Sequence, residues 1–177
     1  MSAERLFEIG RALGALVLSR FDFRKTGLEA AVILPPAEVS AAARKLLETG
    51  YFLETITAVE VREGLLVTYL YDSTADPGRL AVRALADKGG SLPSLALVYP
   101  GAEWHEREAA DFFGLRFLAN PNPAPLLLPC DFDGPPPLLK VPGENVAGLR
   151  DLKIFGEAEI LDPAWRALAA PPGEEAA

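Results

Sequence analysis

The chain has 177 residues, of which 50% are hydrophobic and 24% charged, and its formal net charge is −8. This length and composition are typical of one globular domain with a sizeable core. The acidic balance argues against nucleic-acid binding, which needs lysine and arginine to neutralise phosphates, and one cysteine with one histidine cannot hold an iron–sulfur cluster.

Residues 3–18 predict an amphipathic helix, because leucine and isoleucine recur along one stripe at helical spacing. The spacing of Gly10 and Gly14 within it favours tight packing rather than a phosphate-binding loop. Glu8 and Arg11 interrupt the apolar residues, so we expect no secretory signal here. No apolar run along the chain approaches the roughly 20 residues of a membrane-spanning helix, so no direct membrane insertion is expected.

Helix and strand signals then alternate. Residues 29–34 predict a short strand that two prolines stop, and residues 37–49 predict a helix that Gly50 ends. Residues 52–61 and 65–71 predict two strands, since a short loop between them suits a hairpin.

A third strand is predicted over residues 79–86, where apolar and polar side chains alternate. The alternation indicates one buried face and one face open to solvent or a partner. Short hairpin connections require antiparallel neighbours, so the sequence predicts an α+β fold with a mainly antiparallel sheet and helices packed on one face.

A charged and aromatic helix is predicted next, from residue 103 to Gly114. Glu103 and Glu106 suit its first turn, where the helix dipole favours anions, and Gly114 suits a left-handed C-cap. At helical spacing Trp104, Glu108 and Phe112 share one face.

A carboxylate between two aromatic side chains must find a partner if it is buried, because burying an unpaired charge is costly. That partner lies either within this chain or on another protein. Arg107 and Asp111 are four residues apart, so we expect them to pair within the helix and leave Glu106 and Glu108 to reach elsewhere.

Residues 120–142 contain eight prolines and predict an extended arm rather than a strand or helix interior. Its apolar leucines, at 126–128 and 138–139, favour an arm that packs on its own domain or on a partner over a disordered linker. Beyond it we expect a short strand at 152–155 and a short helix from Asp162-Pro163 through Leu168. The sequence therefore predicts an α+β domain over residues 1–118 and a proline-rich arm with a short C-terminal helix over 119–177.

The segment Tyr99-Pro100-Gly101-Ala102-Glu103-Trp104-His105-Glu106-Arg107-Glu108, followed by Asp111-Phe112-Phe113-Gly114 and Phe117, resembles a known signature. It is similar to that of the C subunit of NADH-quinone oxidoreductase (respiratory complex I) and of the related subunit of membrane-bound [NiFe] hydrogenases. The resemblance covers roughly residues 28–117. Further on, the family carries paired arginines in two segments, and of these basic positions only Lys140 remains here.

The resemblance implies a non-catalytic scaffold subunit of the hydrophilic arm of a complex I-like assembly, on the cytoplasmic side of the cell membrane. Its implied partners are the large hydrogenase-related subunit and neighbouring iron–sulfur subunits, which would carry the redox cofactors for electron transfer from NADH to quinone. We expect no catalytic residue, cofactor or metal in this chain. The residues expected to brace the domain or contact a partner are Trp104, Glu106, Arg107, Glu108, Asp111, Phe112 and Gly114.

Two alternatives stay open. The chain could be the equivalent subunit of a membrane-bound [NiFe] hydrogenase, which the missing arginines favour. Alternatively it could be a free-standing enzyme that uses the Glu106, Glu108 and Asp111 carboxylates for acid–base chemistry.

Overall fold

A computed structural model describes residues 2–141 and 143–169 of the chain. The remaining residues of the predicted arm region, 142 and 170–177, lie outside the described part. The helices and strands, in chain order, are α1 (Ser2–Ala12), β1 (Val17–Arg20), α2 (Phe23–Thr26), β2 (Ala30–Ile33), η1 (Pro36–Glu38), α3 (Val39–Glu48), β3 (Phe52–Val61), β4 (Gly64–Asp72), β5 (Leu80–Ala86), β6 (Ser91–Pro93), α4 (Ala102–Phe113), β7 (Arg116–Leu118), η2 (Leu149–Asp151), β8 (Glu157–Ile160) and α5 (Ala164–Ala169).

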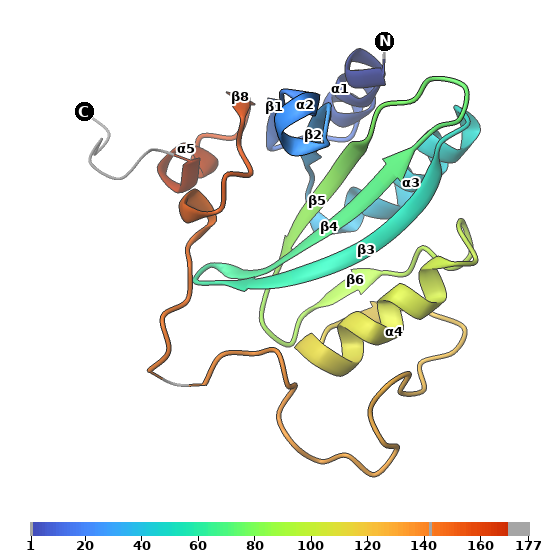
Figure 1. Cartoon of the computed structure of the whole chain (residues 1–177), viewed down its shortest axis with the longest axis vertical. Helices are drawn as coiled ribbons and strands as arrows, with labels where there is room; N and C mark the ends of the chain where they lie inside the picture. Colours follow the sequence, from blue (N-terminus) through green and yellow to red (C-terminus); the bar gives the residue numbers. More distant parts are fainter. Residues whose placement is uncertain (1, 142, 170–177) are drawn as a thin grey trace.

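Six strands form one sheet in the order β3-β4-β5-β2-β1-β8, and only the β2–β5 pair is parallel. The predicted mainly antiparallel α+β fold is therefore confirmed. The three longer helices, α1, α3 and α4, pack their apolar faces on one side of the sheet (Figure 1). The short parallel pair β6–β7 flanks α4, which connects its two strands.

The N-terminal helix is shorter than predicted, because α1 ends at Ala12 and residues 17–20 form β1. Gly14 adopts a left-handed φ of 69°, and Ala15 donates its N–H to the carbonyl of Gly10, as in a Schellman C-cap. Gly10 packs tightly, since an added Cβ would lie 3.0 Å from the side chain of Val32. Apolar residues continue past this cap into β1, so their spacing alone could not indicate where the helix ends.

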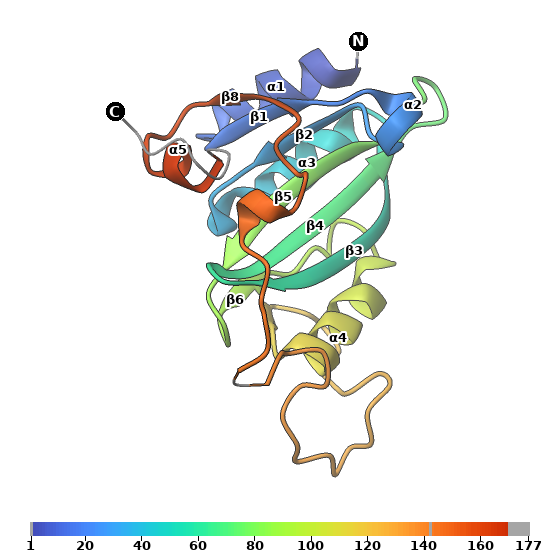
Figure 2. The same cartoon turned by 60° about the vertical axis from the view of Figure 1, so that its left-hand side comes forward.

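The third predicted strand, β5, is buried on both faces, so the expected open face was wrong. Arg83 is 8% exposed, and its guanidinium donates to the carbonyl of Ile154 at 2.7 Å and lies over the ring of Phe21. The residues that cover this face come from the C-terminal segment, which crosses the sheet on the side opposite α3 (Figure 2). They lie too far along the chain for the strand's own pattern to reveal them.

The C-terminal segment returns to the sheet. The strand expected at 152–155 was wrong, because that stretch is irregular and β8 at Glu157–Ile160 pairs antiparallel with β1 instead. Leu149 and Trp165 are buried in a second core cluster with Val61 and Leu66. The expected short helix is confirmed as α5, whose start is capped by Asp162. The division into two parts at residue 118 stays a prediction.

Candidate functional site

The site is built around α4, whose ends are set by its sequence. A turn at Pro100-Gly101 starts the helix, and the N–H of Ala102 donates to the carbonyl of Tyr99. At the other end Gly114 adopts the predicted left-handed conformation with φ 68°. A Cβ at this glycine would lie 3.0 Å from Pro136 of the arm, so the residue serves both the cap and the arm's close approach.

Glu106 lies on the inward face of α4 and has no exposed surface. One carboxylate oxygen accepts the N–H of Leu95 at 2.6 Å, and the other accepts the Ser94 hydroxyl at 2.6 Å and the Asn120 amide at 2.8 Å. Burial raises the pKa of this carboxyl, although the three donors oppose the shift. Glu106 therefore joins the helix to the loop after β6 and to the start of the arm.

Arg107 binds the arm rather than the expected partner. Its guanidinium pairs with Glu103 at 2.9 Å and donates to the backbone carbonyls of Ala124 and Pro125 at 2.8 and 3.0 Å. The predicted pair between Arg107 and Asp111 was wrong, because each side chain finds arm backbone groups that a helix pattern does not contain.

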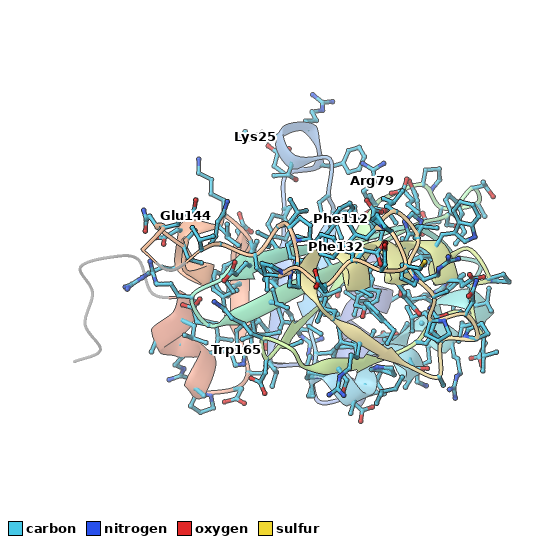
Figure 3. All side chains as sticks on the ribbon, turned by 90° about the horizontal axis from the view of Figure 1, so that it is seen from below. Lys25, Arg79, Phe112, Phe132, Glu144 and Trp165 are labelled. Atoms are coloured by element: carbon cyan, nitrogen blue, oxygen red, sulfur yellow. The ribbon has the colours of Figure 1, made fainter. Side chains whose placement is uncertain are left out.

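Asp111 holds the next residues of the arm. One of its carboxylate oxygens accepts the backbone N–H groups of Leu126, Leu127 and Leu128 at 2.7–3.0 Å. Partial burial alone would raise the pKa of Asp111, but these three donors and the nearby charge of Arg107 hold it below its ordinary value. The arm thus packs on its own domain, which is one of the two outcomes predicted for it. Seen from below, the arm, with Phe132, lies in front of α4 and Phe112 (Figure 3).

The outward face of α4 carries Trp104, Glu108 and Phe112, as predicted from helical spacing. Trp104 is 63% exposed, Glu108 is exposed and Phe112 is partly buried. Among the described residues, no hydrogen bond or ion pair to Glu108 is formed. A groove of about 230 Å³ separates this face from β3. The face therefore presents an aromatic side chain and an unpaired carboxylate to solvent.

The carboxylates do not converge into a shared acid–base site. The oxygens of Glu106 and Asp111 are occupied by donors from their own chain, and Glu108 lies on the outward face. Among the described residues, no group of three or more His, Cys, Asp and Glu side chains is placed to hold a metal ion. Cys130 is a free thiol, exposed in the arm. In the described part of the chain, no helix has the length and apolar character needed to cross a membrane.

The predicted site residues thus separate into two sets by geometry. Glu106, Arg107, Asp111 and Gly114 face the domain and the arm, whereas Trp104 and Glu108 face outward. Ser94 and Asn120 were missed, since neither lies on α4 and no motif couples them to Glu106.

The comparisons with known proteins agree with this fold and signature. The family described as "Respiratory-chain NADH dehydrogenase, 30 Kd subunit" matches residues 32–144. The NADH-quinone oxidoreductase C subunit of Roseiflexus castenholzii is 32% identical over 152 residues, which cover 80% of this chain and 86% of the relative. The corresponding protein of Chlorobium phaeobacteroides is 46% identical over 59 residues, but the match spans only 36% of that relative and 33% of this chain.

Two solved structures share the fold. A trypsin-resistant fragment of Nqo5 superposes with a TM-score of 0.57 at 25% identity, covering 69% of this chain and 99% of the fragment. A chain of the membrane-bound sulfane sulfur reductase, an archaeal respiratory membrane complex, gives a TM-score of 0.55 at 24% identity over 67% of this chain and 71% of that one. With the family match spanning more than half of the sequence, the chain belongs to the family of the 30 kDa subunit of respiratory-chain NADH dehydrogenase.

Proposed function

We propose that this chain is a non-catalytic scaffold subunit in the hydrophilic arm of a complex I-like NADH-quinone oxidoreductase, on the cytoplasmic side of the cell membrane. It supports the large subunit related to [NiFe] hydrogenases, named the large subunit below, and lies near the iron–sulfur subunits. Its own residues bind no cofactor, and the neighbours carry the clusters and flavin during electron transfer to quinone.

The proposal is supported by the difference between the inward-facing and outward-facing residues of α4. Glu106, Arg107 and Asp111 tie the helix to its own loop and arm, which stabilises one rigid shape. Trp104 and Glu108 stay available at the surface. Tryptophan is enriched among the residues that contribute most to protein interfaces. An internally braced helix that presents such side chains suits a subunit whose work is to hold a neighbour in place.

Purification from native cells tests the proposal. A tagged copy of the chain, recovered from gently solubilised membranes, should bring the large subunit with it. The chain produced alone should be colourless and contain no iron or nickel, because one cysteine and one histidine are too few ligands for a cluster. We also expect it to contain no flavin and to oxidise no NADH, since the proposal assigns these to other subunits. Recovery of only the free chain from both membranes and cytosol, or stoichiometric metal in the isolated chain, would overturn it.

A second candidate is the equivalent subunit of a membrane-bound [NiFe] hydrogenase. It is favoured by the arm, which lacks the paired arginines that the resemblance to complex I subunits leads us to expect. The same purification discriminates between the two candidates. A co-purified NADH-binding flavoprotein supports the first, and a nickel-containing large subunit without that flavoprotein supports the second.

A further inference from the structure

β3 is an edge strand of the six-stranded sheet, with β4 as its only strand neighbour. It is ten residues long, and within the described chain its backbone forms no hydrogen bond to any segment outside the sheet. The outer edge therefore presents a row of free N–H and C=O groups, which is a template for pairing with another strand.

The usual protections of an edge strand are weak here. β3 contains no proline or lysine, and its two charged residues, Glu54 and Glu60, are engaged within the chain by Arg79 and by Lys88 with the N–H of Lys140. Its one register shift lies near its start, between Leu53 and Thr55. From Thr55 onward the pairing with β4 is regular through Val61. A long regular edge of this kind invites association unless a specific partner covers it.

The groove beside α4 runs along this free edge. Thr55, Ile56, Thr57 and Ala58 line it in succession, although consecutive strand residues point to opposite faces of a sheet. Four residues in a row can line one groove only from the edge of the strand, where their backbone groups lie. The opposite wall consists of residues of α4, with Leu138 of the arm, and these are Glu108, Ala109, Phe112 and Phe113.

The charge of the groove indicates its occupant. Glu108 is exposed on the wall without a partner among the described residues, and Trp104 precedes it by one helical turn. A cation can pair with this carboxylate and lie against the indole ring. A second copy of the chain would bring another net charge of −8 and another Glu108 to the same edge, which is unfavourable.

We propose that the free edge of β3 and the outward face of α4 form a docking groove for an extended strand of the large subunit. That strand joins the sheet beside β3 by main-chain hydrogen bonds and directs a lysine or arginine to Glu108 and Trp104. The inference rests on the proposed function, because it names the contact through which the scaffold holds its neighbour.

Hydrogen exchange of the full-length chain, free and within the purified complex, tests the edge. In the free chain some amides of residues 55–58 should exchange fast, and in the complex these should slow by at least about tenfold, as new main-chain bonds require. If the chain is in the complex but these amides exchange as in the free chain, the groove proposal fails and the scaffold role stands. If the chain never enters the complex, both fail.

Charge reversal tests the cation, with a matched control. Glu108→Arg should reduce the large subunit recovered with the chain by about tenfold, the change expected when a charge-assisted contact becomes repulsive. Glu48→Arg, on exposed α3 surface, should leave recovery unchanged. Both isolated variants should melt like the parent chain, since neither glutamate is buried. Equal recovery of the large subunit with both variants contradicts the proposal.

A photo-crosslinking phenylalanine analogue at Phe112, on the groove wall, identifies the occupant. The expected crosslink joins it to an extended segment of the large subunit that contains lysine or arginine. A crosslink to a second copy of the chain, or to another subunit, overturns the assignment.

Discussion

Glu106 is a fully buried carboxylate whose two oxygens accept from Ser94, Leu95 and Asn120. Burying a charge is costly unless it is paired or hydrogen-bonded, and here three donors offset part of that cost, while no described cation pairs with Glu106. The same helix carries Glu108 in the open, so two carboxylates two residues apart have opposite roles. Residue type alone could not assign them.

Glu106→Ala should lower the free energy of unfolding by about 2–4 kcal/mol, because the buried N–H of Leu95 and the partly buried donors of Ser94 and Asn120 lose their acceptor. Glu108→Ala is the matched control and should change it by no more than about 0.5 kcal/mol, as for an exposed residue without partners. Denaturant unfolding of the two variants measures both values. Similar losses for the two would show that Glu106 does not brace the domain as its contacts imply.

Asp111→Ala should free the arm in a pH-dependent way. The folded pKa lies below the ordinary value of about 4, so the ionised carboxylate stabilises the fold above that pH. This contribution is lost as the pH falls through the lowered pKa. The variant should therefore be less stable than the parent at pH 7, and the gap should narrow below about pH 4.

Asp133→Ala, at an exposed position of the arm, is the control for Asp111→Ala. Its stability at pH 7 should equal that of the parent chain. Hydrogen exchange at residues 126–128 should accelerate only in Asp111→Ala, because Asp111 accepts their N–H groups. Unchanged exchange there would mean that other contacts hold the arm.

The elements predicted from local patterns were the ones whose partners lie nearby in sequence. α3, β3, β4 and α4 follow directly from helical or alternating spacing and from glycine caps. The errors arose where distant residues decide the structure. The apolar residues that follow α1 form the strand β1, because they pair with β2 and β8. The sequence of β8 contains two glutamates among four residues and does not itself indicate a strand; it forms one because it pairs with β1.

The wrong expectation that one face of β5 is open has the same cause, because distant residues cover that face. Residues 149–155 cover it, although the proline-rich arm separates them from the sheet in sequence. At the site, the helix α4 and the placement of Trp104, Glu108 and Phe112 on one of its faces could be predicted from helical spacing. The donors to Glu106 and Asp111 could not, because they are backbone and loop groups that no sequence motif marks.

Leu149→Ala tests whether this returning segment belongs to the core. Leu149 is fully buried against Ile33, Val61 and Leu66, so its truncation should cost about 2–4 kcal/mol of stability. Leu127→Ala, at a side chain 59% exposed in the arm, should cost less than about 1 kcal/mol. Thermal and denaturant unfolding compare them, and equal small effects would mean that the segment adds little to the fold.

At the scale of the whole molecule, the chain leaves the six-stranded sheet after the interior strand β5 and rejoins it as the edge strand β8. The arm follows α4, and within it the N–H of Leu138 donates to the carbonyl of Phe112. After the arm, η2 packs on the face of the sheet opposite α3, and β8 joins the edge of the sheet beside β1 (Figure 2). The arm therefore connects α4 on one side of the sheet to the segment that covers the other side.

A chain ended after Leu118 tests this arrangement. It loses the arm that Arg107 and Asp111 bind, the strand beside β1 and the cover over Arg83. It should unfold at lower temperature and with less cooperativity than the full chain, and should bind an apolar dye, because the second core cluster is exposed. A chain ended after Ala169, which keeps every described element, should behave like the full chain. If the shorter chain melts as the full chain does, residues 1–118 are an independent domain and the C-terminal segment only covers it.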